Sequence, residues 1–179
     1  KANENYDLEY QKYDSLLTLF DEGKLDALPI EPRPAKYDYP KPIEVYRRIA
    51  NDYPAGQYAD DALYNIAYLY NEMEEGITAR KILRELLEKY PDSDYAPDAY
   101  LNLGDYYFQP RENKDVDESI VELQKAIKLY RKILKFPKSK AYSEALYKLG
   151  WSYYKLTVSD STLYDDAIFY FWRAVEDIA

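Results

Sequence analysis

Adjacent carboxylates, among them three pairs near expected helix starts, are the residues of this sequence whose type and spacing could support acid–base chemistry. The pairs are Asp60-Asp61, Glu74-Glu75 and Asp165-Asp166. Two neighbouring carboxyl groups can divide the roles of general acid and general base in a hydrolytic site. Each pair, however, lies close to the expected start of a helix, where a carboxylate meets free backbone amides and the positive end of the helix dipole. We therefore predict that these residues cap helices and that the chain is not an enzyme.

Histidine and cysteine, which carry much of the chemistry of protein sites, are both absent from the sequence. Their absence removes the commonest general base, the commonest metal ligand, thiolate catalysis and disulfide bonds together. The segment 113–118 resembles a calcium-binding loop, but it lacks the glycine and the distant glutamate of an EF-hand. The five glycines form no phosphate-binding motif. We therefore expect neither a metal nor another cofactor.

The composition is typical of a folded domain or a short repeat array. The chain has 179 residues, of which 47% are hydrophobic and 32% charged, and its formal net charge is −9. This negative charge disfavours nucleic acid and anionic membrane surfaces, which select clustered lysine and arginine. No run of 18 apolar residues is present for membrane insertion. Because the chain begins at Lys1 without a signal-like apolar segment, we expect either a processed mature chain or a fragment.

An amphipathic helix is predicted at residues 4–22, followed by a stop signal at Gly23. Its apolar residues recur at spacings of three and four, at Tyr6, Tyr10, Tyr13, Leu16, Leu17 and Phe20. Residues 29–42 then hold five of the ten prolines, which predicts an extended, non-helical segment. This segment is either a stiff connector packed along the first helix pair or a Pro-rich peptide ligand. We expect helix to resume near Ile43, as the second helix of a degenerate first repeat.

A repeated pattern of large and small residues begins at Leu63 and organises the rest of the chain. Its first-helix sets are Leu63-x2-Ile66-Ala67-x2-Tyr70, Tyr100-x2-Leu103-Gly104-x2-Tyr107 and Leu146-x2-Leu149-Gly150-x2-Tyr153. The second-helix sets begin at Ala79, Ala126 and Ala167, and the first two are closed by Pro91 and Pro137. We expect the small residues of the two sets to face each other where the helices of a repeat cross closely.

This pattern resembles the tetratricopeptide repeat, W-x2-L-G-x2-Y…A-x3-F…P, which has a period of 34 residues. The resemblance covers about residues 42–179. It implies an all-α fold, a right-handed solenoid of about four antiparallel helix pairs. Residues 1–41 would supply the N-terminal helix and the Pro-rich connector.

Three phrases are similar to the repeat arrays of bacterial envelope proteins, such as outer-membrane-assembly lipoproteins and the Tol–Pal coordinator. They are Tyr90-Pro91-Asp92-Ser93, Phe136-Pro137-Lys138-Ser139 and the segment 148–154. The resemblance therefore implies a periplasmic, cell-envelope or extracellular location in a bacterium.

In a tetratricopeptide array the first helices line a groove, and the resemblance places nine residues of this chain there. They are Tyr64, Tyr68 and Asn71, then Leu101, Asp105 and Phe108, then Tyr147, Trp151 and Tyr154. The expected groove is aromatic with acidic rims. Family members that grip a C-terminal carboxylate use lysine and asparagine at these places, whereas aromatic anchors suit an extended or helical peptide. The alternative is that these rings pack against each other or against an inserted loop.

The last predicted helix is apolar around more than half of its circumference, which normally means burial on several sides. Outward positions that hold Glu44, Arg47, Lys81, Arg84, Lys128 and Arg131 in the earlier repeats hold Phe169 and Trp172 here. Together with Ile168 and Val175, these two residues form a predicted end-to-end interface. Its cover would be a further repeat, a neighbouring copy, a different partner or the folded-back N-terminal segment.

Two functions remain open at this point. The first is a non-catalytic protein-interaction scaffold of the bacterial envelope that binds partner peptides in the aromatic groove. The second is a structural subunit that assembles end to end, as a fibre or oligomer, through its uncapped last helix. Seven basic residues between Lys125 and Lys140, with no acid among them, are either a solvated face or a docking surface for the acidic N-terminal helix of another copy. Expected partners are a protein or peptide, including other copies of the chain, and not nucleic acid.

Overall fold

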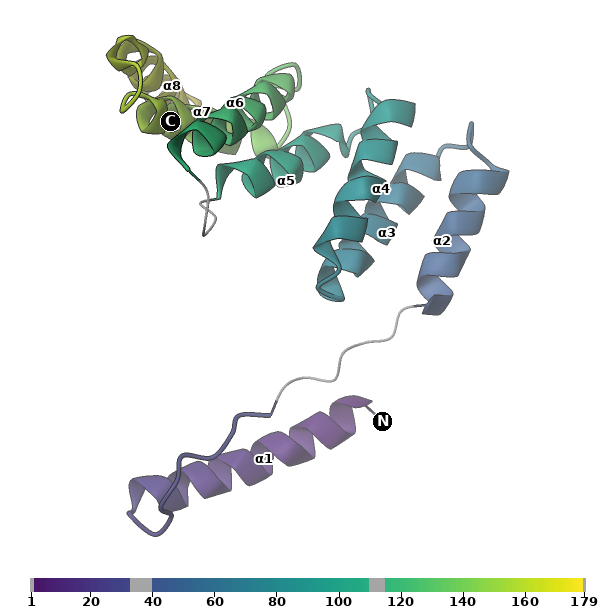
Figure 1. Ribbon diagram of the computed structural model, residues 1–179. Helices are drawn as coiled ribbons and strands as arrows, with labels where there is room; N and C mark the ends of the chain where they lie inside the picture. Colours follow the sequence, from purple (N-terminus) through teal and green to yellow (C-terminus); the bar gives the residue numbers. More distant parts are fainter. Residues whose placement is uncertain (1, 33–39, 110–114, 179) are drawn as a thin grey trace. The chain divides into compact units, whose positions relative to one another are not determined.

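The computed structural model describes residues 2–32, 40–109 and 115–178 of the chain, and all regular elements in these ranges are helices (Figure 1). The chain divides into two compact units, Lys1–Asp38 and Tyr39–Ala179.

The first unit contains helix α1, Ala2–Asp21, which agrees with the amphipathic helix predicted there. Gly23 ends it as expected, in the left-handed conformation with φ of 69°. The Gly23 amide donates to the Phe20 carbonyl at 2.9 Å and the Lys24 amide donates to the Leu19 carbonyl at 2.8 Å. These are the wrapped bonds of a glycine-terminated helix, because only a residue without a Cβ takes this conformation without strain.

The second unit is a series of helices that pack in chain order. The helices are α2 Pro40–Asp52, α3 Ala59–Glu72, α4 Gly76–Lys89, α5 Ala96–Phe108, α6 Val116–Ile133, α7 Ala141–Leu156 and α8 Tyr164–Ile178, with a short 3₁₀ helix, η1 Ser161–Leu163, before α8. The closest packing is within the pairs α3–α4, α5–α6 and α7–α8, and each pair contacts the next. Helix α2 packs on α3. The all-α class and the packing as sequential pairs are confirmed. The pairing of the N-terminal helix with α2 stays a prediction.

The start of α2 differs from the prediction. Residues up to 42 were expected to be extended, yet α2 begins at Pro40 and includes Pro42 in its first turn. The physical reason is that the first amides of a helix have no carbonyl partner within it. A proline there loses no hydrogen bond, and its fixed φ suits the helix. The part of the Pro-rich segment that contains Pro34 lies outside the described residues.

The glycines of the repeat lie at close helix crossings, as expected, but the group that faces them is a ring. A Cβ atom built on Gly104 would lie 2.4 Å from the Tyr130 ring, and one on Gly150 would lie 2.6 Å from the Phe171 ring. The sequence interpretation placed small residues opposite these glycines. The glycines instead make room for the aromatic residue that comes four positions after Ala126 or Ala167.

Candidate functional site

Three of the predicted groove residues lie on one face of α3. Tyr64, Tyr68 and Asn71 are spaced by four and three residues, so their side chains point to the same side of the helix. The Tyr64 ring is half-buried because it stacks on Tyr95, with 4.5 Å between the ring centroids. Tyr68 remains 54% exposed. On this face the Tyr64 ring is therefore fixed against Tyr95, and the Tyr68 ring is accessible to a ligand.

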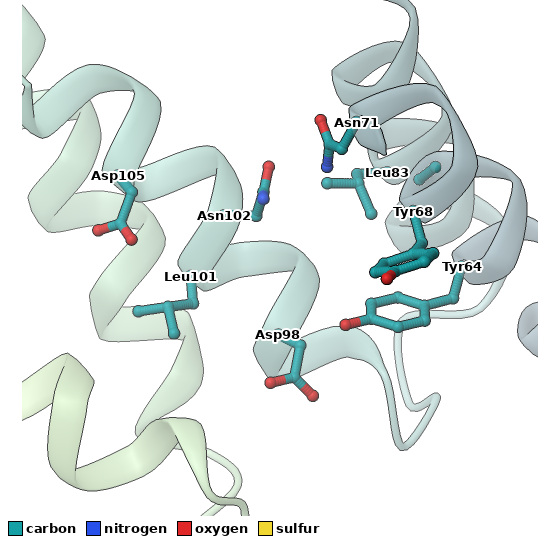
Figure 2. Close-up of a pocket in the computed structure, with 9 residues that line it drawn as sticks. Tyr64, Tyr68, Asn71, Leu83, Asp98, Leu101, Asn102 and Asp105 are labelled. Carbon is teal, nitrogen blue, oxygen red and sulfur yellow. The ribbon is translucent and has the colours of Figure 1, made fainter. Parts of the chain in front are cut away.

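Helix α5 supplies the opposite wall of a cavity of about 250 Å³. The lining residues are Tyr64, Ala67, Tyr68, Asn71, Leu83, Asp98, Leu101, Asn102 and Asp105. Figure 2 shows the two tyrosine rings on the α3 side and Asp98, Leu101, Asn102 and Asp105 along α5, with Asp98 at the end nearer to the rings. Five of the predicted groove residues are thus brought together in one cavity. Asp98 and Asn102 were missed, although they continue the spacing of four and three residues that leads to Asp105.

Asp105 is held by two partners on the neighbouring helices. The Tyr130 hydroxyl donates to its Oδ1 at 2.7 Å, and the Lys148 ammonium lies 3.0 Å from the same oxygen. Tyr130 is fully buried, and burial together with this hydrogen bond raises the pKa of its hydroxyl far above the ordinary value. Asp105 therefore connects α5 to both α6 and α7, and it has less capacity left for a ligand.

Asp98 has a different environment from that of Asp105. Burial raises the pKa of its carboxyl, and the charge of Lys140 offsets this effect only in part. Its own negative charge adds to burial in raising the pKa of the Tyr64 hydroxyl across the cavity. Asp98 is the carboxylate of this cavity that most lacks a compensating positive charge.

Phe108, at the end of α5, lies under two lysines of α7. The ammonium of Lys155 is 3.7 Å from the centroid of its ring, and that of Lys148 is 5.3 Å away. Burial, and secondarily the charge of Lys148, lower the pKa of Lys155. The expectation of acidic rims is therefore wrong for this part of the groove, where the rim is basic. The sequence showed these lysines, but not that both would turn toward Phe108.

The predicted groove residues of α7 form a group of aromatic rings. Trp151 makes edge contacts with Tyr147, Tyr154 and Phe171, at centroid distances of 6.2, 5.6 and 5.5 Å. Trp151 nevertheless remains 37% exposed, and the other two groove residues of α7 are more exposed still. These rings do pack against each other, but in the described residues no loop covers them, so they remain accessible.

The four residues of the predicted end-to-end interface all lie on the exposed side of α8. Ile168, Phe169, Trp172 and Val175 are each about half exposed or more. On the opposite side of α8, Tyr170 and Ala174 are buried. One side of the helix therefore packs on α7, while the apolar surface of its other flank is open. The side chain of Ile178 lies outside the described residues.

The carboxylate pairs lie at helix starts, as predicted, but the first pair bonds side chains rather than helix amides. Asp60 accepts a hydrogen bond from the Ser93 hydroxyl at 2.7 Å. A hydrogen bond to Asp61 is the main reason that the pKa of Tyr95 rises to about 12. No side-chain cap is present on α3 or α4. The capping prediction is therefore wrong for Asp60-Asp61 and Glu74-Glu75. At Asp60-Asp61 the physical reason is that the hydroxyls of Ser93 and Tyr95, which lie just before α5, bond the carboxylates instead.

The calcium-like segment falls partly outside the described residues, which resume at Asp115. Asp115 caps α6 by accepting a hydrogen bond from the Glu118 amide at 2.8 Å. In the described part of the chain, no group of three or more acidic side chains is arranged to hold a metal ion. The helices of this part are also too short or too polar to cross a membrane.

The outward positions of the second helices are exposed where the sequence predicted, with one exception. Lys81 and Arg84 are exposed, as are all seven basic residues from Lys125 to Lys140, which include Lys128 and Arg131. Arg47 is instead half-buried, because its guanidinium donates to Glu85 Oε2 of α4 at 3.0 Å. The basic run therefore forms a solvated face of this chain, and its docking role stays a prediction.

Part of the chain matches a known protein-family model. The tetratricopeptide repeat family model matches residues 61–93 and 144–171, which contain α3–α4 and most of α7–α8. A search of the curated proteins found no match. The two matched segments are helix pairs that bury their repeat positions as the family pattern requires, with Leu63, Ile66, Leu146 and Leu149 fully buried. The chain therefore contains tetratricopeptide repeats in these two segments.

Proposed function

We propose that the chain is a non-catalytic protein-interaction scaffold that binds an extended peptide of a partner protein along α3, α5 and α7. The observation that carries this proposal is the set of accessible aromatic side chains on these helices, above all Tyr68 and Trp151, together with the cavity of about 250 Å³ that Tyr68 lines. Tyrosine and tryptophan bury a large area at a low entropic cost, which is why they dominate the energetics of protein interfaces. The repeat family is itself one of protein-interaction modules, and this supports the proposal.

Selection from a library of random short peptides, panned against the full chain, tests this proposal. The selected peptides are expected to bind the wild-type chain and to lose about 2 kcal/mol or more of binding free energy to Tyr68→Ala, as for an aromatic anchor. Tyr58→Ala is the matched control, because Tyr58 is an equally exposed tyrosine just before α3 and does not line the cavity. Binding that is insensitive to Tyr68→Ala, or weakened equally by both variants, would refute groove binding.

A second function, end-to-end self-assembly, is favoured by the open flank of α8. Trp172 is 57% exposed and lies between Ile168 and Val175 on an exposed apolar surface. Exposed apolar surface of this kind marks interaction sites in soluble proteins. A second copy of the chain would bury it.

The mass of the chain, measured by light scattering over a range of concentrations, tests self-assembly. The wild-type mass is expected to rise with concentration, and Trp172→Glu is expected to abolish the rise. Ile77→Glu is the control, because Ile77 is also an exposed apolar residue but lies on α4. A constant monomer mass for the wild type would exclude this function.

We also propose a periplasmic, cell-envelope or extracellular location in a bacterium. Its support is the similarity of the phrases that begin at Tyr90, Phe136 and Lys148 to those of envelope repeat proteins. Fractionation of the cells that produce the protein tests it, and recovery of the chain in the cytoplasmic fraction alone would refute it.

A further inference from the structure

The cavity between α3 and α5 has an unbalanced charge. Of the residues that line it, the only charged ones are Asp98 and Asp105, and neither lysine nor arginine is among them. Figure 2 shows both carboxylates on α5, with Asp98 nearer to the two tyrosines and Asp105 farther along the helix. The charge of the cavity therefore favours a positively charged group in its occupant.

The two carboxylates do not contribute equally to that preference. Asp105 already accepts the Tyr130 hydroxyl at 2.7 Å and pairs with Lys148 at 3.0 Å. Asp98 has no such partner in the described residues, and burial raises the pKa of its carboxyl despite Lys140. A cation that entered the cavity would relieve this unfavourable burial at Asp98, because a charge-assisted hydrogen bond would replace lost solvation.

The tyrosine wall suits a planar cation. The faces of aromatic rings attract guanidinium and ammonium groups, and arginine is the more frequent partner. This chain makes the same contact elsewhere, where the Arg80 guanidinium lies 3.7 Å from the centroid of the Tyr106 ring. In the cavity, the accessible ring of Tyr68 has no cation of the chain's own above it in the described residues.

We infer that the cavity between α3 and α5 binds an arginine side chain of the partner peptide, with the guanidinium against Tyr68 and bonded to Asp98. The side-chain amides of Asn71 and Asn102, which also line the cavity, bond the peptide backbone on either side of that arginine. This inference rests on the proposed function, because it names the chemistry of the ligand at the same groove.

The composition of the selected peptides tests the inference. Peptides that bind the wild-type chain and depend on Tyr68 are expected to share an arginine at one position, with lysine as the second choice. For one such peptide, Asp98→Asn is expected to raise Kd about ten- to a hundredfold, the range of hydrogen bonds to charged groups, and replacement of its arginine by citrulline should cause a similar loss. Asp117→Asn is the matched control, since Asp117 lies in the first turn of α6 as Asp98 does in α5, and it does not line the cavity.

Asp98→Asn is expected to fold, because it removes a charge that is unfavourably buried. A raised pKa means that ionisation of Asp98 destabilises the folded state, so the neutral variant should melt at an equal or higher temperature at neutral pH. Asp98→Lys provides a second variant, and peptides selected against it should be enriched in Asp and Glu instead of arginine.

The outcomes separate this inference from the proposed function. Tyr68-dependent peptides without a shared basic residue, or an Asp98→Asn variant that binds as tightly as the wild type, would overturn the arginine site and leave groove binding intact. Selected peptides that ignore Tyr68→Ala would overturn both.

Discussion

Helices α6 and α8 occupy equivalent places in their repeats, yet one is covered by a following helix and the other is open. Ile127 follows Ala126 in α6 and is 7% exposed, whereas Ile168 follows Ala167 in α8 and is 64% exposed. The difference is that α7 packs on α6, while no described element of the second unit packs on the corresponding flank of α8. The slot that is core in one repeat is surface in the next, so the open flank of α8 has the composition of an interface.

The outward faces of the two helices also differ, because that of α6 is charged and that of α8 is apolar. In α6 the outward positions are Lys128 and Arg131, which interact well with water, and in α8 they are Phe169 and Trp172. A helix that ended the array as a free surface would be expected to resemble the outer face of α6. The comparison teaches that neighbours, rather than residue type, decide burial along a repeat array.

The glycine crossings give the largest predicted losses of stability in the two repeats. Gly104→Leu is expected to lower the free energy of unfolding by at least about 3 kcal/mol, because the new side chain overpacks Tyr130. Tyr130 is fully buried and bonded to Asp105, so it cannot move away. Gly150→Leu is expected to cost less, about 1–2 kcal/mol, because Phe171 is only half-buried and can tilt outward. Urea unfolding measures both.

The same measurement can break this comparison. Equal losses for the two leucine variants would show that Phe171 is held as firmly as Tyr130, and that the open end of the array is not the looser one. Unchanged stability of Gly104→Leu would contradict the repeat alignment itself.

Truncation of the paired isoleucines gives the next largest effect. Ile127→Ala is expected to cost about 2–4 kcal/mol, since it leaves a cavity under α7. Ile168→Ala is expected to change the stability of the monomer by no more than about 0.5 kcal/mol, because its side chain is mostly in water. Thermal unfolding at low concentration checks both, and a large loss from Ile168→Ala there would show that α8 is covered within a single chain.

A smaller difference in stability is expected between two equivalent serines, one after α4 and the other after α6. Ser93 donates to Asp60 and accepts from the Tyr95 amide at 3.1 Å, whereas the equivalent Ser139 hydroxyl is buried without a partner in the described structure. Ser93→Ala should therefore cost about 1 kcal/mol. Ser139→Ala should be neutral or slightly stabilising. A similar loss from both, seen in urea unfolding, would mean that Ser139 has a partner after all.

The smallest predicted effect is a pH dependence of the stability that comes from Glu85 of α4. Glu85 of α4 bonds Lys89 and Arg47, and although burial opposes them, these bonds lower its pKa below the ordinary 4.5. Its contribution is therefore present above pH 4.5 and is lost as the pH falls through the lowered folded-state pKa. Because the pair is partly exposed, we expect only about 0.5 kcal/mol. Glu85→Gln should flatten this part of the stability–pH curve, and an unchanged curve would count against the ion pair.

The fold was largely predictable because the repeat pattern is a packing requirement. Leu63, Ile66 and Leu149 are fully buried, as expected of large residues beside a close helix crossing. The rings that face Gly104 and Gly150 were not predicted, since periodicity shows which residues point inward but not which of them meet. Helix α2 begins earlier than predicted because a proline in the first helical turn loses no hydrogen bond and its fixed φ suits the helix.

The candidate site was predictable in position and less so in charge. The resemblance to the repeat family placed Tyr64, Tyr68 and Asn71 in a groove, and in the structure they line one cavity together with residues of α5. Asp98 and the two lysines over Phe108 were missed because their roles depend on contacts between neighbouring helices. Long-range contacts of this kind leave no periodic signal in the sequence.

The two tryptophans allow one measurement to test the central claim, that the groove along α3, α5 and α7 binds the partner. Trp151 is a predicted groove residue on α7, and Trp172 lies on the open flank of α8; the chain has no other tryptophan. Fluorine NMR of the fluorotryptophan-labelled chain, titrated with a selected peptide at low protein concentration, would resolve both. The account predicts that the signal of Trp151 shifts while that of Trp172 stays in place. A shift of Trp172 alone would contradict it.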